Sequence, residues 1–359
     1  MIVIADDITG AAEMAGITFS QGQQVRLVCG GSVCGCGTAT YGTTVIATDT
    51  RSMSEAEAVA EIHRITSAFT HHTSAIFKKT DSALRGHVVA ELSALMEATG
   101  YQRAVYLPAN PSKGRIIKNG IYYINHVPIH ETAFSYDPEF PAKTSVLRER
   151  FPDAESKGII MPDAENEEDI QKIIAKYNDG KTLFAGAADL FSALLGHSRE
   201  TRNTRYTRAS NSSSSLILCG STQSKPLDLG IPIAPMPLEI YDGNEDISLW
   251  DTSAYKEKNS LILTMPYTHR TGKEAAVHLR TMMARKAKEL ITQHCPDHLI
   301  IEGGATAWAT LQTLGWTQFE IVAQIAPGVV QMSATNGTLV TLKPGSYPWG
   351  NLFSSSTNT

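Results

Sequence analysis

Short apolar runs alternate with helical patterns along this chain, and this alternation constrains its fold more than any other feature. Buried strands are expected at residues 2–5, 24–29, 44–48, 75–78, 104–108, 158–162, 216–219, 261–265 and 298–301. Helical patterns cover residues 54–69, 88–98, 168–177, 274–294 and 307–314, and another helix opens at 11–15. Strands that alternate with helices in this way are typical of an α/β fold, in which mainly parallel sheets are flanked by helices on both faces.

The length of 359 residues suits two domains better than one core. Residues 197–215 are polar and favour a solvated linker. The linker carries four arginines that could instead grip a phosphate: Arg199, Arg202, Arg205 and Arg208. We therefore expect one α/β domain at residues 1–210 and a second at 211–359, with a cleft between them that suits a small molecule.

Composition excludes several classes of protein. The chain is 42% apolar and 19% charged with a net charge of -5, which indicates a folded, soluble protein without the basic surface of a nucleic-acid-binding protein. Its start does not resemble a signal peptide, and no apolar run approaches the length of a membrane span. The five cysteines fit no zinc pattern, so we expect reduced thiols and a cytoplasmic location, although Cys34 and Cys36 could form a redox pair.

The segment 78–86 is the richest in chemistry. It follows a predicted strand, precedes a predicted helix and reads Lys-Lys-Thr-Asp-Ser-Ala-Leu-Arg-Gly. Arg85 can bind a carboxylate through two parallel hydrogen bonds, and Lys79 can add a point charge. Asp81 can align a hydroxyl or accept its proton. A charged surface loop is the alternative interpretation.

Asp6 and Asp7 stand where the first strand ends and a helix begins. Ligands of open α/β sheets bind beyond the carboxyl ends of the strands, and two acids there could hold sugar hydroxyls or a metal ion. The alternative is that Asp7 or Thr9 simply caps the helix.

A polar excursion follows the strand at 104–108. Asn119-Gly120 predicts a hairpin between residues 115–117 and 122–124, and Arg115 could provide a second contact for an anion. Structural roles are an equally good interpretation of most of these residues.

Glycine-rich turns mark the second half. Gly303 and Gly304 join a strand to a helix that contains Thr306, and Ser221 follows another strand end. Such glycines let backbone N–H groups approach a phosphate, and a helix N-terminus favours negative charge. Pro327-Gly328 and Lys343-Pro344-Gly345 add two further turns. The phosphate-binding loop and dinucleotide patterns do not occur at a suitable place, and each turn alone is typical of an ordinary strand end.

Taken in order, these motifs resemble those of the four-carbon acid sugar kinases. The matching segments are Ala5-Asp6-Asp7-x-Thr9-Gly10-Ala11, Lys79-Thr80-Asp81-Ser82-x-Leu84-Arg85-Gly86, Pro108-Ala109-x-Pro111, Gly114-Arg115, Asn119-Gly120, Gly303-Gly304-x-Thr306, Pro327-Gly328 and Lys343-Pro344-Gly345. The resemblance spans nearly the whole chain, and its N-terminal motifs are the more specific ones. It implies an N-terminal domain that binds the acid sugar and a C-terminal domain that binds ATP.

The resemblance also implies site residues. Those of the acid-sugar site would be Asp6, Asp7, Arg51, Lys79, Asp81 and Arg85, with Arg115 as a further anion contact. Those of the nucleotide site would be Ser221, Gly303, Gly304, Thr306, Lys343 and Gly345. Asp81 is the expected base and Asp7 the alternative, because Lys79 and Arg85 would keep Asp81 ionised.

The chain departs from the family pattern in three places. Ala305 stands where members often carry an acid, the segment 343–350 is longer than usual, and the second half is short.

The expected activity is phosphorylation of threonate, erythronate or a 2-oxo-tetronate by ATP with Mg²⁺, without assigned metal ligands. The alternatives are a non-catalytic sugar-acid sensor and another α/β enzyme such as a dehydrogenase. The expected partners are small molecules, not nucleic acid or a membrane, and a homodimer is left open.

Overall fold

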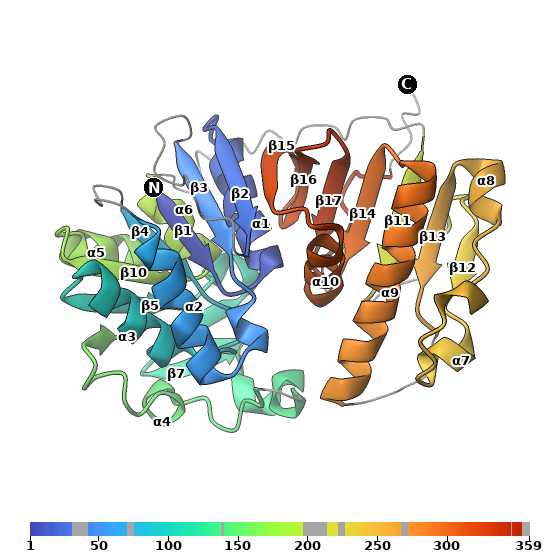
Figure 1. The fold of residues 1–359 in the computed structure, drawn as a ribbon. Helices are drawn as coiled ribbons and strands as arrows, with labels where there is room; N and C mark the ends of the chain where they lie inside the picture. Colours follow the sequence, from blue (N-terminus) through green and yellow to red (C-terminus); the bar gives the residue numbers. More distant parts are fainter. Residues whose placement is uncertain are drawn as a thin grey trace, which may run out of the picture. The chain divides into compact units, whose positions relative to one another are not determined.

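The computed structural model describes residues 1–30, 42–69, 75–137, 140–196, 214–221, 227–266, 272–345 and 347–353. The chain divides into two compact units (Figure 1), of which unit 1 comprises Met1–Thr18 and Gln23–Thr204, and unit 2 comprises Phe19–Gly22 and Arg205–Thr359. Most of the predicted linker at 197–215 lies outside the described residues, as do its four arginines and the Cys34–Cys36 pair.

Unit 1 contains a parallel sheet in the order β2-β3-β1-β4-β10-β5-β9. Its strands are β1 (Ile2–Ala5), β2 (Val25–Cys29), β3 (Thr43–Ala47), β4 (Ile76–Lys79), β5 (Arg103–Leu107), β9 (Ile159–Ile160) and β10 (Thr182–Gly186). Its helices are α1 (Ile8–Ser20), α2 (Glu55–Ser67), α3 (Val88–Thr99), α4 (Leu147–Arg150), α5 (Glu167–Tyr177) and α6 (Ala188–Leu194).

Helices cover both faces of this sheet. Adjacent residues of a strand point to opposite faces, and the neighbours Phe77 and Lys78 of β4 show this directly. The ring of Phe77 packs on Phe191 of α6, with 4.9 Å between the ring centroids, whereas Lys78 pairs with Glu91 of α3. The sheet is therefore buried on both sides, which explains why its strands are apolar runs without polar alternation.

The polar excursion forms a small antiparallel sheet beside the main one. Its elements are η2 (Pro111–Lys113), β6 (Arg115–Lys118), β7 (Ile121–Ile124), β8 (Val127–Pro128), η3 (Ile129–Glu131) and η4 (Ala133–Tyr136). The predicted hairpin is confirmed, because Arg115 pairs with Ile124 and Lys118 with Ile121 across the Asn119-Gly120 turn. Both turn residues have positive φ, at 51° and 72°, as a two-residue hairpin turn requires.

The strands of unit 2 lie in the order β12-β13-β11-β14-β17-β16-β15. The strands are β11 (Ser215–Cys219), β12 (Ile233–Pro235), β13 (Ser260–Thr264), β14 (His298–Glu302), β15 (Gln318–Ala326), β16 (Val329–Ala334) and β17 (Leu339–Lys343). The helices are α7 (Leu238–Tyr241), η6 (Ile247–Leu249), α8 (Ala254–Lys258), α9 (Lys273–His294) and α10 (Gly304–Leu314). Strands β12, β13, β11, β14 and β17 are parallel, and β15 and β16 are antiparallel to their neighbours.

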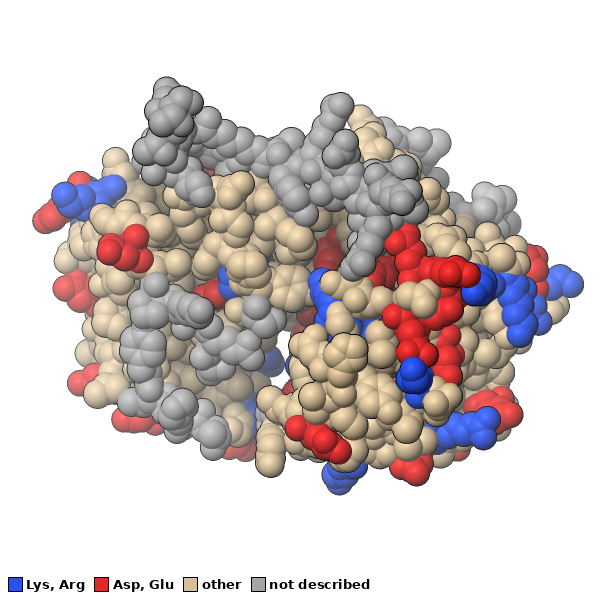
Figure 2. Space-filling view, turned by 180° about the vertical axis from the view of Figure 1, so that it is seen from behind, with Lys and Arg blue, Asp and Glu red and all other residues tan. Residues whose placement is uncertain are grey.

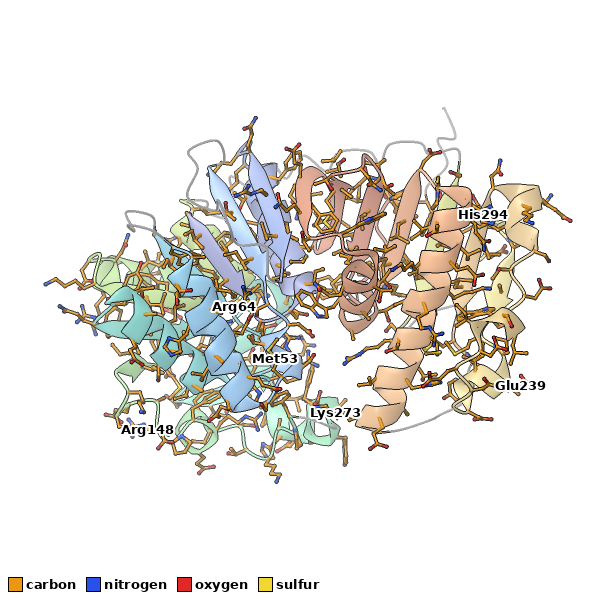
Figure 3. The ribbon with its side chains drawn as sticks, in the orientation of Figure 1. Met53, Arg64, Arg148, Glu239, Lys273 and His294 are labelled. Carbon is orange, nitrogen blue, oxygen red and sulfur yellow. The ribbon has the colours of Figure 1, made fainter. Side chains whose placement is uncertain are left out.

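Different segments cover the two faces of the strands of unit 2. Helices α9 and α10 pack on each other and contact β11 and β14; Figure 3 labels the ends of α9 at Lys273 and His294. On the other side, the apolar row of Ile217, Ile262 and Ile300 is covered by residues of the 227–231 loop and by Trp349, Leu352 and Phe353 near the C-terminus. The segment after Lys343 is therefore part of the core of unit 2.

The predicted α/β class with mainly parallel sheets is confirmed, and the cleft between the domains stays a prediction. The sequence pattern did not predict β10 and α6 in unit 1, or β12 and the β15–β17 hairpins in unit 2.

None of the helices in the described ranges combines the length and the apolar character that a membrane crossing needs. On the face drawn in Figure 2, basic side chains are scattered among acidic ones, and no broad basic patch covers its coloured part.

The N-terminus of α2 offers a test of the local sequence signal. Ser54 and Glu57 form a capping box, in which the Ser54 N–H donates to Glu57 at 2.8 Å and the Glu57 N–H donates to Ser54 Oγ at 3.4 Å. We expect Ser54→Ala to lower the free energy of opening of α2 by about 1 kcal/mol, measured by hydrogen exchange of residues 55–67. Ser54→Asp should retain the protection, and equal exchange in both variants would contradict the cap.

Candidate active site

Three parallel strand ends bring together the charged residues of unit 1. Asp6 and Asp7 follow β1, Asp81 follows β4, and Arg51 lies in the short turn η1 (Thr50–Ser52) after β3. Because β1 pairs in parallel with both β3 and β4, these residues lie at one edge of the sheet. Figure 3 labels Met53, which directly follows the turn that carries Arg51.

Arg51 is the centre of this cluster. Its Nε donates to Asp6 Oδ2 and its Nη2 to Asp6 Oδ1, both at 3.0 Å, and its Nη1 donates to Asp7 Oδ2 at 3.2 Å. Its Nη1 also lies 3.7 Å from Asp81 Oδ1. One guanidinium therefore holds three carboxylates in place.

Asp81 is held within its own loop. Arg85 donates from Nε to Asp81 Oδ2 at 2.8 Å and from Nη2 to Asp81 Oδ1 at 3.0 Å, while the N–H of Ala83 donates to Oδ2 at 3.0 Å. This bidentate pair is strong and directional. Arg85 was predicted to hold the carboxylate of a ligand, and in the structure its guanidinium fork is engaged by Asp81.

The three aspartates differ in their pKa values. Burial raises the pKa of Asp81, but Arg51 and Arg85 outweigh burial and hold it far below its ordinary value. Arg51 and Lys79 likewise outweigh burial at Asp7, so that its pKa is lowered. Burial dominates at Asp6 and raises its pKa, although Arg51 opposes the shift. Asp7 and Asp81 are thus ionised at neutral pH.

The alternative interpretation of Asp7, that it caps the helix, is confirmed, and its role at a ligand stays a prediction. It caps α1, because Oδ1 accepts from the Gly10 N–H at 2.8 Å and Oδ2 from the Thr9 hydroxyl at 2.6 Å. It also pairs with Arg51. A methyl group on Gly10 would lie 2.7 Å from Asp7 Oδ1 and 3.3 Å from Lys79 Nζ, so glycine at this position leaves room for both charged side chains.

Lys79 belongs to a second group of charges at the same edge. Its Nζ donates to the Thr80 carbonyl at 2.9 Å and lies 3.8 Å from Glu13 of α1. Lys113 in η2 donates to the other oxygen of Glu13 at 2.6 Å. The sequence did not predict Glu13 or Lys113 as site residues. Glu13 has the pattern of a surface helix residue, and Lys113 lies 100 residues away from it in the chain.

Arg115 lies at the start of β6 and reaches the 78–86 segment. It donates from Nη1 to the hydroxyl of Ser82, and its guanidinium stacks over Phe134 of η4, with 5.7 Å from Cζ to the ring centroid. The buried Tyr122 donates from its hydroxyl to the Ser82 carbonyl. The structure therefore brings Arg115 to the loop of Asp81 and Arg85, and it adds Ser82 and Phe134 to the candidate residues.

A buried ion pair supports the turn that carries Arg51. Lys78 Nζ lies 2.7 Å from Glu91 Oε2, and the side chains of the two residues are 1% and 2% exposed. The Thr50 hydroxyl donates to the same Glu91 oxygen at 2.8 Å and lies 2.9 Å from the hydroxyl of Thr48. This chain of contacts ties helix α3 to the residue directly before Arg51.

In unit 2, the predicted nucleotide residues also gather at parallel strand ends. Gly220 and Ser221 follow β11, Gly303 and Gly304 follow β14, and Gly345 follows β17. β14 lies between β11 and β17, so the three turns are neighbours. Thr306, buried in the first turn of α10, lies beside Gly220.

The glycines here are required by close packing. A methyl group on Gly220 would lie 2.0 Å from the Thr306 hydroxyl, and one on Gly345 would lie 2.1 Å from the Ser221 hydroxyl. Gly303 has a φ of 100°, which disfavours other residues. Backbone therefore dominates this edge, as in sites that bind phosphate at a helix N-terminus.

Lys343 is engaged inside the unit. It forms a buried ion pair with Glu302, donates to the Gly345 carbonyl at 3.1 Å, and lies 4.8 Å from the centroid of the Trp349 ring. The predicted role of Lys343 at a phosphate stays a prediction. In the structure it joins β14, the Gly345 turn and the C-terminal segment.

The chain is similar to proteins with two named domains. Residues 1–153 match the family described as the sugar-binding N-terminal domain, and residues 250–347 match the nucleotide-binding C-terminal domain. The Asp6–Arg51–Asp81 cluster lies in the first match, and the Gly303 and Gly345 turns lie in the second.

Curated relatives and solved structures agree with this match. The chain is 30% identical to a D-threonate kinase of Salmonella typhimurium over 225 residues, which cover 54% of this chain and only about half, 53%, of that protein. It is 24% identical to a 3-oxo-tetronate kinase of Brucella melitensis, over 96% of this chain and 92% of that protein. A Haemophilus influenzae protein of solved structure has the same fold, with a TM-score of 0.68 at 20% identity over 98% of both chains.

The buried Lys78–Glu91 pair generates a prediction. Glu91→Gln leaves the Lys78 ammonium buried without its carboxylate, so it should lower the free energy of unfolding by about 3–5 kcal/mol. The double variant Lys78→Met/Glu91→Gln removes both charges and should be more stable than Glu91→Gln alone. Urea denaturation of these two variants and of Lys78→Met measures the difference, and simple additivity of the two single changes would contradict a coupled pair.

Proposed function

Because the chain belongs to the four-carbon acid sugar kinase family, which joins a sugar-binding to a nucleotide-binding domain, we propose that it phosphorylates a four-carbon acid sugar with ATP. The acceptor would be threonate, erythronate or a 2-oxo-tetronate. The observation that carries the proposal is the cluster of Asp6, Asp7, Asp81 and Arg51 at three adjoining strand ends of the sugar-binding domain. The names of relatives with a similar sequence support the same chemistry.

The residues that would bind the phosphoryl acceptor, the sugar acid, lie in unit 1. Ionised carboxylates at fixed positions accept hydrogen bonds from hydroxyl groups, and Asp7 and Asp81 are both ionised and held by arginines. A sugar acid carries several hydroxyls together with a negative charge. Carboxylates and cations that alternate within one cluster can bind both kinds of group.

We propose Asp81 as the residue that orients the attacking hydroxyl and takes up its proton, with Asp7 as the alternative. The low pKa of Asp81 keeps the residue ionised but gives it little proton affinity. This is compatible with phosphoryl transfer, in which positioning and charge stabilisation supply most of the rate and little is asked of a base. Orientation would then be the larger part of the role of Asp81.

The donor end falls to unit 2. The N–H groups of the Gly303–Gly304 turn and the start of α10 would bind phosphate oxygens, flanked by Ser221, Thr306 and Gly345. Mg²⁺ usually binds kinases through one or two carboxylates together with the phosphates of the nucleotide. The described residues contain no cluster of three or more candidate metal ligands. Glu302 is the carboxylate nearest in sequence to the glycine turn, and its side chain is paired with Lys343.

A second candidate function is sugar-acid binding without transfer. The observation that favours it is Ala305, a residue with no donor for a metal or ribose in the first turn of α10. A chain with this function would keep the acceptor site and lose turnover.

Release of ADP decides between the two functions. Purified protein with ATP and Mg²⁺ should release ADP in the presence of at least one of threonate, erythronate and their 2-oxo forms. Tight binding of NAD would instead favour a dehydrogenase. If calorimetry detects binding of an acid sugar while none of the panel yields ADP, the binding function holds and the kinase is wrong.

The role of Asp81 has its own test. Asp81→Asn should lower kcat by about 10²- to 10⁴-fold, because the neutral amide neither pairs with Arg85 nor takes up a proton. Asp7→Asn should reduce kcat less. Asp246→Asn, at an exposed turn of unit 2, is the control and should leave kcat unchanged. Near-full turnover of Asp81→Asn would exclude Asp81 from the reaction.

A further inference from the structure

Arg115 differs from the other arginines of the cluster in what it binds. It donates to the Ser82 hydroxyl and stacks on Phe134, and it forms no ion pair with any carboxylate in the described part of the chain. Arg51 and Arg85, by contrast, each form a bidentate pair with an aspartate. Within the described ranges, the charge of Arg115 therefore has no direct acidic partner.

The surroundings of Arg115 hold it in place. Two guanidiniums lie over Phe134, since the Cζ atom of Arg85 is 5.9 Å and that of Arg115 5.7 Å from its ring centroid. Ser82 is fixed from behind, because the buried Tyr122 donates to its carbonyl. Stacked guanidiniums lose little freedom when they bind, which favours a defined site for an anion.

The two guanidiniums beside the Phe134 ring differ in their acidic partners. Arg85 pairs with Asp81 and reaches Asp137 at 3.4 Å, whereas the contacts of the Arg115 guanidinium within the described residues are the neutral Ser82 hydroxyl and the Phe134 ring. A site with one unmatched guanidinium and an adjacent hydroxyl suits a carboxylate, which takes two parallel N–H bonds from arginine. Ser82 directly follows Asp81, so this anion would lie beside the residue proposed to orient the attacking hydroxyl.

Building on the kinase proposal, we propose that Arg115, with the Ser82 hydroxyl, binds the carboxylate of the acid sugar and thereby selects acids over neutral polyols. Arg115 thereby takes the carboxylate-binding role that the sequence predicted for Arg85 and Lys79. Arg85 instead acts as a positioning residue that holds Asp81. Selection of acids and orientation of the hydroxyl are thus separate tasks of two neighbouring arginines.

The test compares each acid with its uncharged partner. Steady-state kinetics use the acid sugar that gives turnover and the four-carbon polyol, threitol or erythritol, of matching stereochemistry. In Arg115→Met, the KM for the acid should rise about 10- to 100-fold, as expected for the loss of hydrogen bonds to a charged group, while kcat changes less. The preference for acid over polyol should fall by the same factor.

Three further variants sharpen the result. Arg115→Lys should recover part of the acid preference, because a point charge remains. Arg85→Met should lower kcat with the acid preference retained, since it acts through Asp81. Arg148→Met, an exposed arginine of α4 labelled in Figure 3, is the matched control and should change neither.

The outcomes separate this inference from the kinase proposal. If the unmodified protein turns over an acid and Arg115→Met keeps the full acid preference, the assignment of Arg115 is wrong while the kinase stands. If the unmodified protein turns over none of the acids, the kinase is wrong, and calorimetry with threonate, erythronate and the polyols then tests Arg115 alone. Equal affinity of the unmodified protein and Arg115→Met for the acid would overturn the inference in that case.

Discussion

Arg51 binds two adjacent aspartates at the end of β1, and the arrangement of the acceptor site depends on that interaction. Without a cation, burial and mutual repulsion would favour protonation of one acid or its movement toward solvent. The parallel register places Ala5 opposite both Ala47 of β3 and Lys79 of β4, so the residues that follow these strands emerge side by side. The turn after β3 brings Arg51 to this edge, and Thr50 ties that turn to Glu91 below it.

The second unit uses the same geometry with different chemistry. Cys219, Glu302 and Lys343 lie in one row across β11, β14 and β17, and the turns that follow are rich in glycine. Glu302 and Lys343 neutralise each other within the sheet, so side chains contribute little net charge at this edge. Backbone N–H groups and the first turn of α10 remain to face an anion. One edge therefore suits a polyhydroxy acid, and the other suits phosphate groups.

Apolar runs and motifs predicted most of the parallel strands and the residues at their ends, because parallel strand ends necessarily converge. The β15–β17 hairpins escaped prediction because they lack the intervening helices on which the alternation argument rests. The interactions between residues of the site were not predicted for another reason. The pairing of Arg85 with Asp81 depends on a loop in which Leu84 has a φ of 63°, and no spacing rule announces that conformation. Glu13 likewise gained its role through tertiary contacts alone.

The antiparallel excursion gives the fold a way to separate selectivity from chemistry. The aspartates stand on strand ends of the main sheet, where movement would disturb a core buried on both faces. Arg115 and Phe134 come instead from the small β6–β8 sheet and the η4 turn, which are not part of the main sheet. Changes in the excursion can therefore alter which anion is held while the hydroxyl-binding carboxylates stay in place. Relatives that differ in acid substrate would then be expected to differ first around the position of Phe134, and less around Arg51.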